Sequence, residues 1–125
     1  MRWGRIVAGG FLAELALIVV AVPALAFGNQ TILNWTAVIG SALTSYLGAL
    51  WVARRLESRI VLHGALVGVT AMVIYLAILA ASGQIQSQPA IYWLAHLCKI
   101  LGGTAGGLFA ARRVASVSGI VRANV

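Results

Sequence analysis

The sequence predicts an all-α integral membrane protein: a four-helix bundle made of two parallel-related helical hairpins, with both termini in the cytoplasm. Three observations predict this fold. Of the 125 residues, 62% are hydrophobic and 9% charged, with a mean hydropathy of +0.99, whereas about a quarter of the residues of a water-soluble domain are charged. The apolar residues form four long segments. Arginines lie before the first segment, between the second and third, and after the fourth. We expect a single transmembrane domain over residues 1–125.

The four apolar segments define the expected helices, over residues 6–27, 32–53, 60–82 and 90–111. Each is close to the ~20 residues that cross the hydrocarbon core of a bilayer. Only helices and closed barrels satisfy their backbone in lipid, and strict period-two alternation is absent, so helices are favoured. Turn-forming residues separate the segments at Gly28, at residues 54–59 and at residues 82–89. The length of the first segment and Glu14 within it argue against a cleaved signal peptide.

The arginines set the expected orientation. They lie before the first segment, in the middle connection and after the fourth segment, at Arg2, Arg5, Arg54, Arg55, Arg59, Arg112, Arg113 and Arg122. The other two connections carry no charged residue. Short loops rich in arginine stay in the cytoplasm, so both termini should lie on the cytoplasmic side of the cell (inner) membrane. The net charge of +7 is therefore a topology signal, and we expect no nucleic-acid partner.

The arginines near the middle connection and after the fourth segment form an expected basic cluster at the membrane surface. Its members are Arg54, Arg55, Arg59, Arg112 and Arg113. Such clusters attract anionic lipid headgroups, which makes membrane lipids an expected partner. The alternative is that these residues only determine topology.

An internal repeat relates the two halves of the chain. The sequence Arg-Ile-Val that begins at Arg5 recurs at Arg59, and in both copies a glycine and a leucine follow at the same spacing. Residues 48–55 (Gly-Ala-Leu-Trp-Val-Ala-Arg-Arg) recur as residues 106–113 (Gly-Gly-Leu-Phe-Ala-Ala-Arg-Arg). Both copies begin after an arginine and end at a double arginine. They should therefore share one orientation, with a symmetry axis along the membrane normal.

Small residues recur at helical spacing, above all on the second and fourth expected helices. Helices in lipid associate by close backbone approach at such residues. These two helices should therefore be central, and the same faces would allow self-association, either as a homo-oligomer or in a larger membrane complex. The alternative is that these small residues allow the helices to slide or bend during transport. The predicted packing residues are Gly10, Gly40, Gly48, Gly64, Gly68, Gly102, Gly103, Gly106 and Gly107.

Two formally charged residues lie inside apolar segments, where charge is costly. Glu14 is in the first segment and Lys99 in the fourth, at depths that differ by only about 6 Å at a rise of 1.5 Å per residue. An ionised group there costs at least ~2.5–3.5 kcal/mol on insertion scales, and such groups face the protein interior and tend to pair. Glu14 is one turn from Gly10 and Lys99 one turn from Gly103, on faces expected to be buried. We predict a contact between Glu14 and Lys99.

Two interpretations of this intramembrane charged pair remain open. In the first, the pair is a structural ion pair that fixes the helix register, with Tyr46, Thr44 or His96 adding hydrogen bonds. In the second, Glu14 is a protonatable site that releases its proton when a cation arrives. A lysine beside Glu14 would keep the carboxylate ionised and oppose cation binding.

Catalytic and metal-binding residue patterns are missing from the sequence. It contains no aspartate, so no Ser-His-Asp set can form. His96 and Cys98 alone lack the number of ligands of a zinc or copper site, and His63 is expected at the membrane interface. No haem or nucleotide motif is present. We therefore expect no enzymatic activity, no bound metal and no cofactor.

Two family resemblances follow from these residues. Residues 63–68 (His-Gly-Ala-Leu-Val-Gly), after an arginine-bearing loop, resemble a group of uncharacterised small four-span prokaryotic membrane proteins in which a glycine-rich helix also ends in Ala-Arg-Arg or a similar run. That resemblance covers the layout of the whole chain and implies no known activity. Residues 9–15 (Gly-Gly-Phe-Leu-Ala-Glu-Leu) are similar to the first helix of the small multidrug resistance transporters, whose glutamate binds protons and cationic substrates alternately.

The second resemblance implies that Glu14 is such a carboxylate. The chain departs from that family in three ways: it carries Lys99 within the membrane, it lacks the Tyr- and Trp-bearing glycine-rich motif of the family's third helix, and its arginine bias forbids insertion in both orientations. We therefore expect a non-enzymatic integral membrane protein with a structural or accessory role. The alternative is a proton-coupled transporter or channel for a small molecule or cation, using Glu14.

Overall fold

The structure is a computed structural model that describes the backbone of residues 3–54, 56 and 58–123, with side chains for these residues except 87 and 117–123. Within this part of the chain the fold is all-α, without a strand. The elements are α1 (Trp3–Ala26), α2 (Gln30–Ala53), α3 (Ile60–Ala81), the short 3-10 helix η1 (Ile85–Ser87) and α4 (Ala90–Ala123). All four α-helices are long and apolar enough to cross a membrane. The predicted all-α class is thus confirmed, with four candidate spans, as in a multi-pass membrane protein.

Local signals explain where the helices begin and end. The side-chain oxygen of Asn29 accepts hydrogen bonds from the backbone N–H groups of Thr31 at 2.9 Å and Ile32 at 3.2 Å, which satisfies donors left unpaired in the first turn of α2. Gly28 and Gly83 follow α1 and α3 with φ angles of 62° and 70°. Glycine adopts this left-handed conformation without steric cost, so these residues end both helices.

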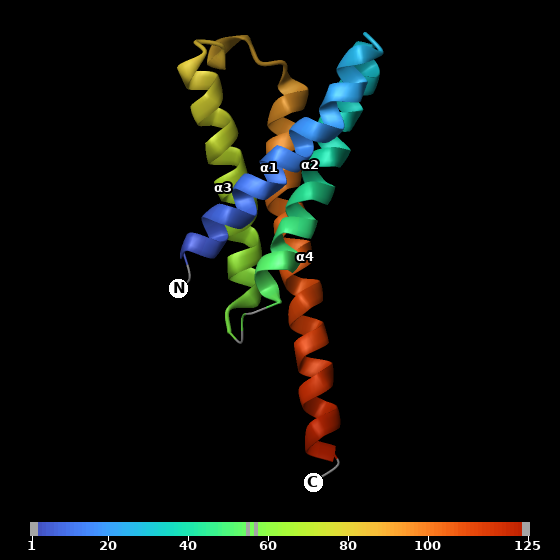
Figure 1. Cartoon of the computed structure of the whole chain (residues 1–125), viewed down its shortest axis with the longest axis vertical. Coiled ribbons are helices and arrows are strands. Elements are labelled where there is room, and N and C mark those ends of the chain that lie inside the picture. The colour runs from blue at the N-terminus through green and yellow to red at the C-terminus, as the bar shows by residue number, and fades with distance from the viewer. Residues whose placement is uncertain (1–2, 55, 57, 124–125) are drawn as a thin grey trace.

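The helices run alternately up and down, so the start of α1, the end of α2, the start of α3 and the end of α4 lie at one end of the bundle (Figure 1). We call this the arginine end, after Arg5, Arg54, Arg59, Arg112 and Arg113. α2 and α4 share the most extensive contact, and α2 also packs against α1 and α3. α1 and α4 lie diagonally: among the described residues, no Cα atoms of these two helices approach within 8 Å.

Every glycine that the sequence predicts to pack helices lies against another helix. The closest approaches join α4 to its two neighbours. A Cβ atom added to Gly64 of α3 would overlap the backbone oxygen of Gly103, and one added to Gly102 would overlap the backbone oxygen of Ala42 on α2. A Cβ atom at Gly106 would lie 2.5 Å from a backbone oxygen of α2. These backbones approach closely because no side chain stands between them.

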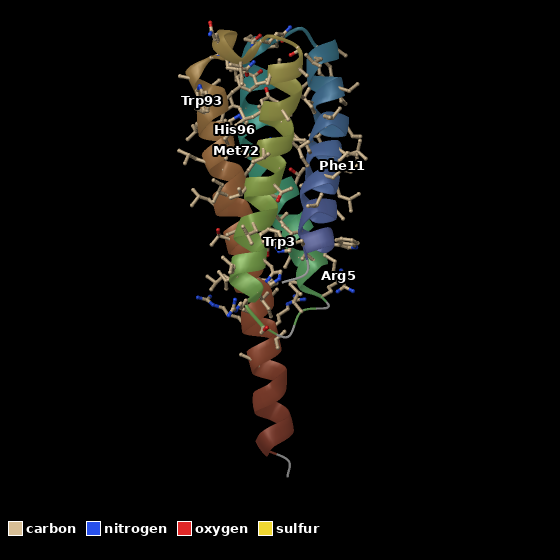
Figure 2. All side chains as sticks on the ribbon, turned by 90° about the vertical axis from the view of Figure 1, so that its left-hand side faces the viewer. Trp3, Arg5, Phe11, Met72, Trp93 and His96 are labelled. Carbon is tan, nitrogen blue, oxygen red and sulfur yellow. The ribbon has the colours of Figure 1, made fainter. Side chains whose placement is uncertain are left out.

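The two ends of the bundle differ in packing. At the arginine end, the space between the helices is filled by an apolar cluster of Ile6, Val52, Ala53, Leu56, Ile60 and Val67. Further along, the interior holds the charged pair and a cavity described below. Large apolar side chains cover the outside: Val19 is 65% and Leu101 66% exposed, and Phe11 points outwards in Figure 2. Water-soluble proteins rarely expose a large continuous apolar surface, whereas lipid solvates it.

α4 departs from the sequence prediction, which ended this helix at residue 111. The helix continues to Ala123 and projects beyond the other three helices in Figure 1. The prediction was wrong because hydropathy marks the end of the apolar span, whereas a helix continues until the backbone is interrupted, and no proline follows residue 111. Residues 112–116 are exposed. At the other helices the largest difference is at α1, which begins at Trp3 and not at residue 6.

Candidate functional site: a buried ion pair beneath an apolar cavity

The structure brings Glu14 and Lys99 together, in the contact that the sequence predicts. Lys99 Nζ donates a hydrogen bond to Glu14 Oε2 at 2.7 Å, and the side chains are only 2% and 5% exposed for Lys99 and Glu14 respectively. Because α1 and α4 are diagonal neighbours, the two long side chains span a gap that their backbones do not close. The ion pair therefore crosses the interior of the bundle.

Lys99 has a second partner on α3. Its Nζ atom lies 4.7 Å from the centre of the Tyr75 ring, within the range in which an aromatic face attracts an ammonium group. The Tyr75 hydroxyl donates a hydrogen bond to Gln88 Oε1 at 3.2 Å, which restrains the ring. The ammonium thus lies between a carboxylate from α1 and an aromatic ring from α3.

A close helix–helix approach positions Lys99. Gly68 of α3 lies directly against the backbone of Lys99 and Ile100, and a Cβ atom at Gly68 would overlap the Lys99 carbonyl group. The backbone of α4 is therefore held against α3 at the residue that carries the charge. The lysine side chain then extends across the bundle towards Glu14.

The buried polar atoms that lack hydrogen-bond partners within the described part of the chain include three on α2 and α4. These three are Ser41 Oγ and Ser45 Oγ on α2 and His96 Nδ1 on α4. The three residues are 1%, 0% and 5% exposed respectively. The His96 ring packs against aromatic neighbours, with its centre 5.0 Å from that of Tyr75 and 5.8 Å from that of Trp93. Buried polar atoms without partners are uncommon in folded proteins, so each one requires an explanation.

A cavity of about 310 Å³ lies directly beside the pair, and we call it the central cavity. All four helices contribute to its wall. Its inner end is lined by Glu14, Ser41, Tyr75, His96 and Lys99, and leucine, isoleucine and alanine side chains with Tyr92 line the rest. It extends away from the arginine end, as far as Leu25 at the end of α1 and Leu33 at the start of α2. Figure 2 shows His96 and Trp93 towards this end, opposite Arg5.

The other residues predicted to support the pair have different roles. Thr44 Oγ1 donates a hydrogen bond to the backbone oxygen of Gly40 on its own helix, at 2.8 Å. The Tyr46 ring packs against Phe109, with 6.3 Å between ring centres. His96 does join the site, as a neighbour of Tyr75. The prediction that Tyr46 or Thr44 would add hydrogen bonds to the pair gains no support, because their neighbours are helix backbone and an aromatic ring.

His63 and Cys98 lie outside this site. His63 is buried in the first turn of α3, where its Nδ1 atom is 2.8 Å from the backbone oxygen of Arg59 and hydrogen-bonded to it. Cys98 is half-buried with a free thiol. The described residues include no group of three or more His, Cys, Asp or Glu side chains that could hold a metal ion.

The basic cluster is brought together only in part. Arg54 and Arg113 line one hollow between α2 and α4, and Arg5 and Arg54 line another beside Trp51. The Arg113 guanidinium also lies 4.6 Å from the centre of the Phe109 ring. Arg2 and Arg55 lie outside the described residues, as does the side chain of Arg122.

Sequence reasoning missed two members of the site, Ser41 and Tyr75. A signal for Ser41 was present, because Ser41 is at the position equivalent to Lys99 in the predicted internal repeat. Tyr75 gave a weaker signal: it is a polar-tipped ring within an otherwise apolar helix. Nothing in the sequence indicated a cavity, because a cavity depends on how far apart the helices pack.

No protein-family model, curated protein or solved structure matches this chain. The two family resemblances therefore stay predictions.

Proposed function

We propose that this chain is a small, non-enzymatic integral membrane protein with a structural or accessory role, in which the Glu14–Lys99 pair fixes α1 against the rest of the bundle. The observation that supports this role is the 2.7 Å contact between two buried charges. It links two helices whose backbones do not pack against each other. Removing one partner of a buried ion pair leaves an uncompensated charge, so both residues are needed together.

A proton-coupled transporter is the second candidate, and one observation favours it. Glu14 lines the central cavity, as a substrate-binding carboxylate would. Lys99 opposes this function, because its ammonium group already forms an ion pair with the Glu14 carboxylate, with 2.7 Å between Nζ and Oε2. A cation would have to displace Lys99 into an apolar interior, which is costly.

The variant Glu14→Gln separates the two functions. We would purify the wild-type protein and the variant, measure thermal unfolding in detergent, and reconstitute both into vesicles that carry a pH gradient. If the pair is structural, the variant unfolds at a lower temperature and neither protein moves protons or a cationic dye. Proton or dye flux through the wild-type protein, lost in a Glu14→Gln variant that still folds, would overturn the structural role.

We also propose that the protein lies in the inner membrane of the cell. Both termini and the connection between α2 and α3 would then be on the cytoplasmic side. The support is the arginine bias, because arginine-rich short loops stay on that side. The hollows that join Arg54 to Arg5 and to Arg113 would receive anionic lipid headgroups at that surface. Self-association through glycine-rich faces stays a prediction, and the packing of these glycines inside one chain gives it no support.

A further inference from the structure

A hollow at the arginine end adjoins a groove between α1 and α2, and Trp51 lines both. The hollow, which we call the arginine hollow, has a volume of about 310 Å³ and is lined by Arg5, Trp51, Val52 and Arg54. The groove, which we call the outer groove, has a volume of about 200 Å³. Besides Trp51, it is lined by Leu12, Ala13, Ala16, Thr44, Leu47 and Gly48. A polar space is thus joined to an apolar one on the outside of the bundle.

The outer groove exists because small residues lie between large ones. Ala13 is buried and Gly48 half-buried, whereas Leu12 and Leu47 are 45% and 61% exposed. The two small residues therefore form the floor of the groove, and the two leucines form its sides. The Thr44 hydroxyl donates its hydrogen to the backbone of its own helix. The groove accordingly presents an apolar surface to the acyl chains of a bilayer.

The hollow and the groove together extend over the depth of one leaflet. At a rise of 1.5 Å per residue, the distance along α1 from Arg5 to Ala16 is roughly 16 Å, and that along α2 from Arg54 to Thr44 is roughly 15 Å. Half of the ~30 Å hydrocarbon core of a bilayer is about 15 Å. A lipid whose headgroup lies at the arginines would therefore place an acyl chain along the whole groove.

Two guanidinium groups determine which headgroup the hollow prefers. Arg54 is exposed and Arg5 half-buried, so a headgroup can reach both, and guanidinium groups donate paired hydrogen bonds to phosphate oxygens. Among the described residues, no carboxylate lines the hollow. Of the two acidic residues in the sequence, Glu14 is paired with Lys99, and Glu57 lies outside the described residues. A phosphate with net negative charge is therefore favoured over a headgroup that also carries a cation, which the arginines repel.

We propose that the arginine hollow and the outer groove form one binding site for an anionic phospholipid of the leaflet at the arginine end. The phosphate accepts hydrogen bonds from Arg5 and Arg54, and one acyl chain follows the groove towards Ala16. Trp51 lies between these two parts, as expected of a residue that favours the border between headgroups and hydrocarbon. The inference rests on the lipid contact proposed above for this surface, and it assigns that contact to one lipid with a defined place for its headgroup and its chain.

Fluorescence quenching by lipids with brominated acyl chains tests the site, because Trp51 lies where its two parts meet. In the full chain, we would replace Trp3, Trp35 and Trp93 with phenylalanine, which leaves Trp51 as the only tryptophan. The protein is reconstituted into phosphatidylcholine vesicles that contain either brominated phosphatidylglycerol or, for comparison, brominated phosphatidylcholine. Phosphatidylglycerol should bind about 5-fold to 25-fold more tightly, since each arginine near a membrane surface contributes about fivefold.

Matched arginine variants distinguish this site from the positive charge of the whole surface. Arg5→Gln and Arg54→Gln should each lower the preference for phosphatidylglycerol about fivefold. The control is Arg112→Gln, which removes the same charge at the same end of the bundle, from an exposed residue that does not line the hollow. It should lower the preference by less than about twofold, because salt screens charges that are not in contact.

A second pair of variants tests the groove. Ala16→Phe places a ring in the groove at an exposed position and should remove most of the quenching by phosphatidylglycerol. The control is Ala105→Phe, at an exposed position of α4, which should leave the quenching unchanged. Glycerophosphoglycerol, the same headgroup without acyl chains, should not relieve the quenching even in large excess, because it makes no contact with the groove.

Several results would overturn the proposal, and they separate it from the proposed function. A preference lowered equally by Arg54→Gln and Arg112→Gln would overturn the site alone, because it would show attraction to the basic surface as a whole. Equal quenching in Ala16→Phe and Ala105→Phe, or relief of quenching by glycerophosphoglycerol, would do the same. Equal quenching by the two lipids would overturn both the site and the lipid contact proposed for this surface.

The test stays decisive if one variant is unstable. If Arg5→Gln does not fold, Arg54→Gln at an exposed position gives the same comparison with Arg112→Gln. None of these measurements changes Glu14 or Lys99, so the site can fail while the structural role of the ion pair holds.

Discussion

Replacing Lys99 with methionine should lower the free energy of unfolding by about 3–5 kcal/mol, because the substitution leaves Glu14 buried without its partner. The magnitude follows from the geometry. The charged atoms are 2.7 Å apart, in side chains that are 2% and 5% exposed. At this separation the Coulomb attraction is about 6 kcal/mol for an effective dielectric constant of roughly 20. The desolvation of both groups offsets part of it.

The double variant Glu14→Leu, Lys99→Met should recover most of the loss. Replacing both members of a buried pair with apolar residues of similar volume is often neutral or stabilising. We would compare the wild type, both single variants and the double variant by thermal unfolding in one detergent. Each single variant should lower the Tm by more than about 10 °C, and the double variant should unfold close to the wild type.

The thermodynamic cycle formed by these four proteins measures the coupling between the two residues. A double variant whose loss equals the sum of the two single losses would refute the reasoning, because it would mean that the two side chains do not stabilise each other. Single variants as stable as the wild type would refute it too, since a buried unpaired charge must be costly.

Two further predictions concern packing and orientation. Gly64→Ala should destabilise the bundle by about 1–3 kcal/mol, as overpacking does, because its Cβ atom would overlap the backbone of α4. The matched control is Gly4→Ala, because no neighbouring atom lies within 4 Å of that position. Equal Tm values for the two variants would contradict the prediction. A protease-sensitive tag fused after Val125 should be cleaved only from the cytoplasmic side, and cleavage from outside the cell would show that the orientation derived from the arginines is wrong.

The helices, the charged pair and the packing glycines could be predicted because each reflects a free-energy requirement in lipid that single residues or short runs of the sequence reveal. Apolar runs of sufficient length must be helical in lipid, so the four long helices could be predicted from the sequence. Glu14 and Lys99 were recognisable because a charge in lipid needs a partner, and the chain offers these two at similar depth. Glycines at helical spacing predicted close helix contacts, and residues such as Gly64 and Gly103 do meet.

The remaining features depend on distances between helices, which no local pattern encodes. The sequence did not indicate that α1 and α4 are diagonal neighbours, nor that their separation leaves a cavity beside the pair. Tyr75 belongs to the site because α3 turns that ring towards Lys99, and a single tyrosine in an apolar helix gives no such information. The end of α4 was missed for a different reason: leaving the apolar region does not require a helix to stop.

The continuity of α4 has a mechanical consequence. Ala90–Ala123 is one uninterrupted helix of 34 residues, or about 50 Å at 1.5 Å per residue, longer than the ~30 Å of hydrocarbon that a bilayer provides. The helix passes through the interior at Lys99, and its end projects past the other three helices (Figure 1). From Lys99 to Ala123 the helix is roughly 36 Å long, so a tilt of about 5° at the level of the lysine would displace its end by roughly 3 Å. A change in the ion pair that tilted α4 would therefore cause a larger displacement at the end of the helix, beyond the bundle.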